Sequence, residues 1–355
     1  MFLGIIISTS GLIINIIQAI LYFCLKRYNK HYYRKINYYL CYIIYSQVVF
    51  LGDWWSGSEL SIYMNEDDYK KYYGKEHGFV LMNHCYEVDW IIACMLLDRM
   101  KILGNFKLSA KNTLEYFPVL GWLLKFGESI YLKRNWDIDK RIIGPKILQL
   151  TSYLDPMWLL FFAEGTRVLP KYLLESQKFS KEKGLPILKY HLTPRTKGFI
   201  EIIRYLRGKN VAIYDIQIAF NPDDQVEPTI INILRGKKLH AHCYIKRIPL
   251  SEVPDEEAAA VWLYKKFQEK DKMADSFNNT GDFFATSGIE KTLIYKLDKR
   301  YLSLINVVTW ALLIIVSMLI FFIKLYLFGS VICLLIAASC LVIPYVAMNI
   351  AISLS

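Results

Sequence analysis

The sequence has little charge for its length and no closely paired cysteines. Charged residues make up 21% of its 355 residues, against 54% hydrophobic residues. This composition excludes a disordered chain, which lacks the apolar surface needed to offset chain entropy, and it is too apolar for an ordinary soluble domain. Seven cysteines without a C-x-x-C pair exclude a small disulfide-scaffolded module and argue against structural zinc, so we expect no metal site. The composition predicts one globular domain with hydrophobic membrane segments.

Acidic residues are outnumbered by basic ones. The sequence has 43 Lys and Arg residues against 32 Asp and Glu residues, a formal net charge of +11. This balance favours anionic partners such as phospholipid headgroups, phosphate-bearing substrates or nucleic acid. The chain contains no recognised nucleic-acid-binding motif, and many of its lysines flank apolar segments. We therefore expect a lipid bilayer as a partner and no nucleic acid.

No basic residue precedes the first apolar run, which argues against a cleaved signal peptide. That run, Phe2 to Leu25, is about 24 residues long, enough to cross hydrocarbon as a helix. A second, aromatic-rich run from Ile36 to Leu51 leads to Trp54-Trp55, a pair that suits the level of the lipid headgroups. Residues 1–52 are predicted to form a membrane-embedded two-helix segment.

Two more apolar runs lie near the other end of the sequence. They extend from Leu302 to Ile323 and from Leu325 to Leu354, and Lys324 and Gly329 mark the turn between them. Uncharged runs of this length are rare in the cores of soluble proteins. Residues 301–355 are predicted to form a transmembrane helical hairpin.

Between these anchors, residues 53–300 alternate short apolar runs with amphipathic stretches, which is typical of an α/β domain. The predicted strands are Gly78 to Met82, Trp158 to Phe162, Pro186 to Tyr190, Val211 to Phe220 and His242 to Ile248. The predicted helices are Trp90 to Arg99, Ile138 to Leu150, Leu173 to Lys183, Lys197 to Arg207 and Glu256 to Met273.

An imidazole and a carboxylate follow the first of these strands. His84 and Asp89 are five residues apart, which would point them in different directions within one regular helix. Contact between them requires a loop after the strand, with Asp89 in the first turn of the next helix. A carboxylate on one ring nitrogen fixes the histidine tautomer and raises its basicity, so that the other nitrogen can take a proton from a hydroxyl group. The pair is a candidate general base.

A second polar motif, Glu164-Gly165-Thr166-Arg167, follows the strand predicted at Trp158 to Phe162. Its glycine permits a tight turn, and its arginine can form a bidentate contact with phosphate. Because sites in α/β sheets form at the carboxyl ends of strands, this motif predicts an anion site at the end of a second strand.

Four motifs in this order resemble those of the glycerolipid acyltransferases. They are Asn83-His84 with Asp89, Lys133-Arg134, Glu164-Gly165-Thr166-Arg167, and Leu185-Pro186. The segment from Lys189 to Phe199, the pair Trp54-Trp55 and the stretch Gly74-Lys75-Glu76-His77 are similar to the gamma and delta types of 1-acylglycerol-3-phosphate acyltransferase. The resemblance extends over most of the chain and implies a mixed-sheet α/β acyltransferase domain between membrane hairpins. One departure is Ala163, where many members of the family have proline.

The resemblance also implies roles for individual residues. His84 would deprotonate the sn-2 hydroxyl of lysophosphatidic acid while Asp89 orients it, and acyl-CoA would be the donor, with no further cofactor. Because a thioester is already activated, the alcohol can attack directly, and the neighbouring Cys85 is not expected to act as a nucleophile. The expected substrate-binding residues are Lys133, Arg134, Glu164, Gly165, Thr166, Arg167 and Pro186. In this set the basic side chains hold the phosphate, Glu164 binds the acceptor or holds Arg167, and Pro186 helps to shape an acyl channel.

Other functions are compatible with the same sequence. The acceptor could be another lysophospholipid, such as lysocardiolipin or lysophosphatidylinositol, because the catalytic pair would be shared. A catalytically silent membrane protein that binds anionic lipid would need only the basic surface and the hairpins. The family resemblance implies a multi-pass protein of the endoplasmic reticulum membrane.

Overall fold

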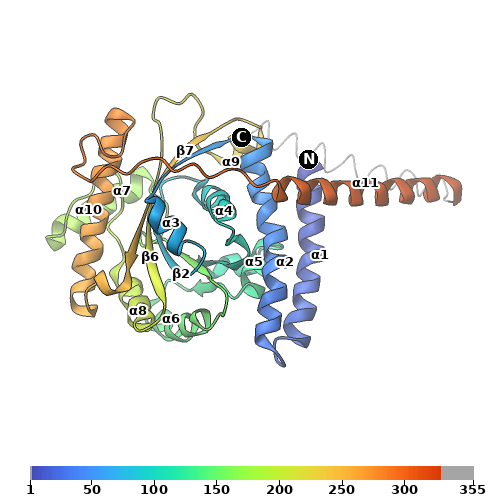
Figure 1. Ribbon diagram of the computed structural model, residues 1–355, viewed down its shortest axis with the longest axis horizontal. Coiled ribbons are helices and arrows are strands. Elements are labelled where there is room, and N and C mark those ends of the chain that lie inside the picture. Colours follow the sequence, from blue (N-terminus) through green and yellow to red (C-terminus); the bar gives the residue numbers. More distant parts are fainter. Residues whose placement is uncertain (1, 329–355) are drawn as a thin grey trace.

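A seven-stranded sheet forms the centre of the protein. The computed structural model describes residues 2–328, and Figure 1 shows their arrangement. The strand order is β1-β7-β6-β2-β5-β3-β4, and neighbouring strands are parallel except β6 and β7. The strands are β1 (Glu59–Tyr63), β2 (His77–Met82), β3 (Phe106–Lys111), β4 (Ile130–Leu132), β5 (Trp158–Phe161), β6 (Val211–Phe220) and β7 (His240–Pro249). The predicted mixed α/β sheet is confirmed.

Four of the five predicted strands are present, as β2, β5, β6 and β7. The strand predicted at Pro186 to Tyr190 is wrong, because this segment has no regular secondary structure. Two of its backbone N–H groups, those of Lys189 and Tyr190, donate to the carboxylate of Asp271 rather than to a neighbouring strand. Strands β1, β3 and β4 were not predicted. β4 has only three residues, and in β3 lysine and serine alternate with apolar residues, so β3 is not a continuous apolar run like the predicted strands.

Helices cover both faces of the sheet (Figure 1). Val80 and Met82 of β2 belong to the core that contains α2 and α4, while Phe79 and Leu81 belong to the core that contains α6, α8 and α10. This alternation is expected of a strand buried on both faces. The helices of the domain are α3 (Glu66–Tyr72), α4 (Asp89–Arg99), α5 (Leu120–Phe126), α6 (Trp136–Thr151), α7 (Pro170–Lys183), α8 (Thr196–Leu206), α9 (Ile230–Leu234) and α10 (Glu256–Thr280). All five predicted helices are present.

The N-terminal hairpin consists of α1 (Phe2–Cys24) and α2 (Lys30–Phe50), which continues into a π-helical turn at Leu51–Trp55. Its polar side chains lie between the helices. Gln47 Nε2 donates to Ser10 Oγ over 2.8 Å, and Gln18 Nε2 donates to Asn37 Oδ1 over 2.8 Å. The opposite side of α1 exposes large apolar side chains, those of Leu12, Ile13, Ile16, Ile17, Ile20 and Phe23. Such an apolar exterior around a polar contact is typical of a helix in lipid.

Among residues 2–328, two helices are long and apolar enough to cross a membrane, Leu3–Cys24 within α1 and Leu302–Leu327 within α11 (Leu302–Phe328). α2 instead packs along the domain, against α4 and the turn at Leu103–Asn105. Figure 1 shows α11 leading away from the domain, across the direction of α1 and α2. The second apolar run predicted near the C-terminus, Leu325 to Leu354, lies almost entirely outside the described residues.

A buried carboxylate joins the hairpin to the domain. Glu128 accepts from Arg34 Nε over 2.7 Å and from Tyr153 Oη over 2.7 Å, and Lys26 Nζ lies 2.9 Å from its other oxygen. Burial raises the pKa of Glu128, but Lys26, Arg34 and Tyr153 together outweigh it and lower the pKa to about 2. The end of the hairpin is therefore held to the domain by an ionised group.

Candidate active site

The loop between β2 and α4 brings His84 and Asp89 into contact. β2 ends at Met82 and α4 begins at Asp89, so the five-residue spacing spans the loop and the helix start as predicted. His84 Nδ1 lies 3.0 Å from Asp89 Oδ2, and the same oxygen accepts from the backbone N–H of Tyr86 over 2.9 Å. Asn83 fixes the base of the loop by exchanging two side-chain hydrogen bonds with the backbone of Ile218 in β6.

The two members of the pair differ in exposure. The side chain of Asp89 is fully buried, whereas that of His84 is 24% exposed. Burial raises the pKa of Asp89, an effect opposed by its bonds to His84 and to the Tyr86 N–H. The imidazole stacks on Phe162, with ring centroids 4.1 Å apart. Because Nδ1 is held by Asp89, Nε2 is the ring nitrogen left to exchange a proton with a substrate.

Glu164 connects this loop to two other segments. Its Oε1 accepts from the backbone N–H of His84 over 2.7 Å, and its Oε2 accepts from the backbone N–H of Leu192 over 3.0 Å. Val168 N donates to the carbonyl of His84 over 2.8 Å, so the backbone of the histidine is held on both sides. The structure thus places Glu164 behind the base, and not against Arg167 as one of the sequence-based alternatives had it.

The turn at Gly165 approaches two arginines. Gly165 has φ +73°, a conformation that disfavours other residues, and a Cβ atom there would lie 2.7 Å from Arg195 Nε, so any side chain would have to displace this arginine. Arg134 Nη2 donates to the Gly165 carbonyl over 2.8 Å, which brings the predicted second and third motifs together. Thr166 is half-buried beside the turn, and Lys133, which follows β4, is exposed.

Arg167 forms an ion pair with Glu87, a residue that the sequence analysis did not single out. Arg167 Nη1 lies 3.0 Å from Glu87 Oε1, and the two side chains are 32% and 37% exposed. Glu87 lies in the His84–Asp89 loop, so this pair places the guanidinium beside the candidate base. Since an exposed ion pair contributes at most about 1 kcal/mol, the guanidinium can exchange Glu87 for a bound anion at little cost.

The positions of Pro186 and Cys85 bear on two of the sequence predictions. Pro186 is half-buried in the irregular segment between α7 and α8, rather than in a strand. The Cys85 sulfur lies 3.8 Å from the Tyr190 carbonyl, and burial raises the pKa of this thiol well above its ordinary value. A thiol kept protonated is a poor nucleophile, which agrees with the prediction that Cys85 does not attack the substrate.

The sequence analysis missed a second histidine–carboxylate pair. His191 Nδ1 lies 3.0 Å from Asp271 Oδ1 of α10. His191 is 1% exposed. Eighty residues separate the two in the sequence, so no local spacing could have indicated the contact.

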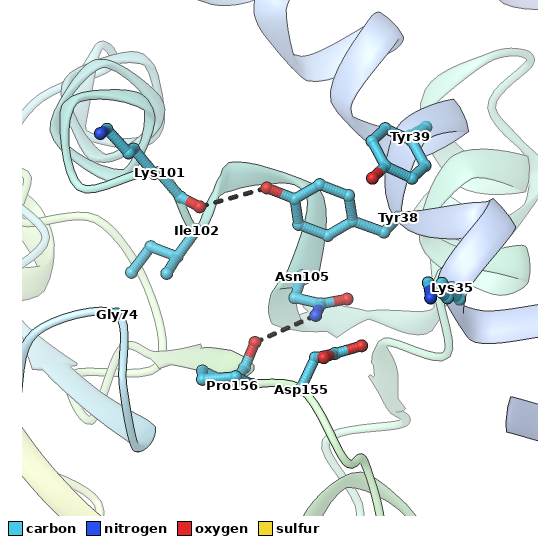
Figure 2. Close-up of a pocket in the computed structure, with 9 residues that line it drawn as sticks. All are labelled: Lys35, Tyr38, Tyr39, Gly74, Lys101, Ile102, Asn105, Asp155 and Pro156. Atoms are coloured by element: carbon cyan, nitrogen blue, oxygen red, sulfur yellow. Dashed lines mark hydrogen bonds between the residues drawn. The ribbon is translucent and has the colours of Figure 1, made fainter.

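A cavity of about 250 Å³ lies elsewhere on the domain (Figure 2). It is lined by Lys35, Tyr38 and Tyr39 of α2 together with Gly74, Lys101, Ile102, Asn105, Asp155 and Pro156. Several of these residues precede β2, β3 and β5, and therefore mark the amino edge of the parallel strands. His84 and Glu164 follow β2 and β5 at the carboxyl edge, which is where sites of α/β sheets form.

Comparison with known proteins gives two family matches. The family model described as Acyltransferase matches residues 63–219, and the one described as Acyltransferase C-terminus matches residues 232–310. The chain is 39% identical to 1-acyl-sn-glycerol-3-phosphate acyltransferase delta of Rattus norvegicus over 307 residues, 86% of this chain and 78% of the relative. It is 40% identical to the delta protein of Bos taurus over 303 residues, which are 85% of this chain and 77% of that relative. It is 34% identical to the gamma protein of Homo sapiens over 328 residues, which are 92% of this chain and 84% of that relative.

Proposed function

Because this chain belongs to the 1-acyl-sn-glycerol-3-phosphate acyltransferase family, we propose that it transfers an acyl group from acyl-CoA to the sn-2 hydroxyl of lysophosphatidic acid. The products are phosphatidic acid and free coenzyme A. The observation that carries the proposal is the His84–Asp89 pair, in which Nδ1 is held at 3.0 Å and the His84 side chain is 24% exposed.

The reaction needs one proton to move at His84. Nε2 accepts the proton of the sn-2 hydroxyl as its oxygen attacks the thioester carbonyl carbon. The carbon–sulfur bond then breaks, and the proton passes from His84 to the departing thiolate of coenzyme A. Asp89 stabilises the imidazolium that forms between these two steps. A general base of this kind contributes about 10²- to 10⁴-fold to the rate.

The phosphate of the acceptor would bind to the basic residues around the Gly165 turn. Arg134 already reaches the Gly165 carbonyl, and Arg167 lies in the exposed pair with Glu87. A guanidinium can bind two phosphate oxygens at once, which favours arginine over lysine for this role. Lys133 adds positive charge at the same edge of the sheet. Thr166 would line the phosphate site, while Glu164 supports it from behind.

We also propose that the reaction needs no metal ion or bound cofactor, since the donor is an activated thioester. Activity should then persist in the presence of a chelator. The substrate and the product are lipids, and two helices in the described part of the chain are apolar enough to cross a membrane, which supports action at a bilayer. From its family, we also propose that the protein lies in the endoplasmic reticulum membrane and crosses it more than once.

The test is a panel of lysophospholipid acceptors presented with one acyl-CoA to membranes that contain the protein. Lysophosphatidic acid should have the highest kcat/KM, and Arg167→Ala should raise the KM for this acceptor while leaving the KM for acyl-CoA within about twofold. Faster transfer to lysocardiolipin or lysophosphatidylinositol would show that the acceptor assignment is wrong. No transfer to any acceptor would favour a silent protein that binds anionic lipid.

A further inference from the structure

One carboxylate of α10 organises the segment that lies behind the candidate base. Asp271 Oδ2 accepts from the backbone N–H of Lys189 over 2.8 Å, and Oδ1 accepts from the backbone N–H of Tyr190 over 2.7 Å. Oδ1 also lies 3.0 Å from His191 Nδ1. The segment has no regular secondary structure of its own, so these contacts replace the hydrogen bonds that a strand or helix would supply.

The next residue of that segment connects it to the base. Leu192 N donates to Glu164 Oε2 over 3.0 Å, and Glu164 Oε1 accepts from His84 N over 2.7 Å. Asp271 therefore accepts backbone N–H groups from this segment, and Glu164 accepts one from the same segment and one from the His84–Asp89 loop. Glu164 is 2% exposed, and both of its oxygens are occupied by these bonds, so a shift of Leu192 must change its position.

We propose that Asp271 is a positioning residue for His84, acting through Leu192 and Glu164. The inference rests on the proposed function, because it concerns the geometry of the same base. Asp271 lies within the stretch matched by the Acyltransferase C-terminus family, whereas His84 and Glu164 lie within the stretch matched by the Acyltransferase family. The C-terminal region therefore contributes to catalysis by holding the base in place.

The nearby Asp275 supplies a matched control. It lies one turn further along α10 and contacts the same segment, through Lys189 Nζ at 2.8 Å and Tyr190 Oη at 2.9 Å. These contacts involve side chains only, and Asp275 is 45% exposed against 15% for Asp271. A substitution at Asp275 removes a carboxylate from the same helix without removing a backbone anchor.

The first experiment compares steady-state kinetics of Asp271→Asn and Asp275→Asn with acyl-CoA and lysophosphatidic acid. Asparagine offers one acceptor oxygen in place of two, so Asp271→Asn should lower kcat about tenfold while both KM values stay within about twofold. Asp275→Asn should keep kcat within about twofold. Asp271→Glu, which restores the carboxylate, should recover part of the loss. Equal kcat values for the two asparagine variants would overturn the inference.

The second experiment is a double-mutant cycle with Glu164→Gln. If Asp271 acts through Glu164, the kcat of the double variant should lie within about twofold of the kcat of Glu164→Gln alone. If the double variant instead loses kcat by the product of the two single reductions, Asp271 acts by another route and the inference is overturned. An inactive wild-type protein would instead refute the proposed function, so the two failures are distinct. If Asp271→Asn is recovered unfolded, the cycle is run with Asp271→Glu. Effects on kcat that do not multiply then support the inference, and effects that multiply overturn it.

Discussion

Replacing Asp89 by asparagine tests the proposal that its carboxylate makes His84 a general base. Asp89 Oδ2 accepts from both His84 Nδ1 and the backbone N–H of Tyr86, and its side chain is fully buried. An asparagine oxygen in the same place keeps both hydrogen bonds but carries no charge. If the amide nitrogen takes that place, it repels the Nδ1 proton and reverses the histidine tautomer. Either arrangement leaves the imidazolium of the transition state without its counter-charge.

The expected loss of kcat follows from the distance between the charges of Asp89 and the His84 imidazolium. Opposite unit charges about 4 Å apart attract by about 4 kcal/mol at an effective dielectric constant of about 20. Loss of that stabilisation corresponds to about a 10³-fold lower kcat. KM for acyl-CoA and lysophosphatidic acid should change little, because the carboxylate is buried behind the imidazole and does not face the substrate.

The assay is release of coenzyme A thiol under saturating substrates, for membranes matched in protein level. Glu59→Gln serves as the control, because Glu59 is an exposed residue of β1 whose pair with Lys238 lies at the surface. A kcat for Asp89→Asn within tenfold of wild type would refute the reasoning, since it would mean that the charge of Asp89 does not support the base.

Three other substitutions test separate contacts. Glu128→Gln should lower the free energy of unfolding by about 3–5 kcal/mol, because it leaves the buried Arg34 without a counter-charge, and thermal unfolding in detergent measures this. Burial raises the pKa of Glu128 but its ion pairs lower it to about 2, so its stabilising effect is complete above about pH 4.3 and is lost as the pH falls towards 2. Gly165→Ala should lower kcat/KM at least about tenfold, because the positive φ and the nearby Arg195 oppose a Cβ atom, and unchanged kinetics would contradict this. Cys85→Ala should keep most of the activity and wild-type transfer should resist iodoacetamide, whereas complete loss in the alanine variant would indicate a thiol nucleophile.

The His84–Asp89 contact was predictable from sequence because its determinants are local. A buried strand ends at Met82, and the next helix begins at Asp89. These two boundaries could be inferred from apolar runs alone, and they leave a loop of the right length for the 3.0 Å contact. The long apolar helices α1 and α11 were predictable for a similar reason, because long uncharged runs indicate them without reference to other parts of the chain.

The network behind the base was not predictable, because its contacts are distant in sequence. The apolar stretch from Pro186 to Leu188 matches the pattern of a buried strand, but its continuation is held by Asp271 from α10. Glu164 was predicted to belong to the site, yet its partners are the backbone N–H groups of His84 and Leu192. A backbone donor leaves no signature in the sequence, so such a role is visible only once the loops are placed together.

The second N-terminal helix shows the same limit. Its aromatic run, Ile36 to Leu51, predicted membrane embedding, and the hairpin with α1 is present. The buried side of α2 also carries Arg34, Asn37 and Gln47, which bond to Glu128, Gln18 and Ser10. Composition alone does not tell whether an amphipathic aromatic helix packs on protein or on lipid, because both surfaces accept the same side chains.

The most direct test of the account is transfer of a labelled acyl group from acyl-CoA to lysophosphatidic acid by wild type and by His84→Ala. Both proteins are expressed in membranes at the same level, and phosphatidic acid is measured. The account predicts that wild type forms phosphatidic acid and that His84→Ala falls to background, with the acyl-CoA still bound. Full activity in His84→Ala would contradict the central claim that this histidine is the general base.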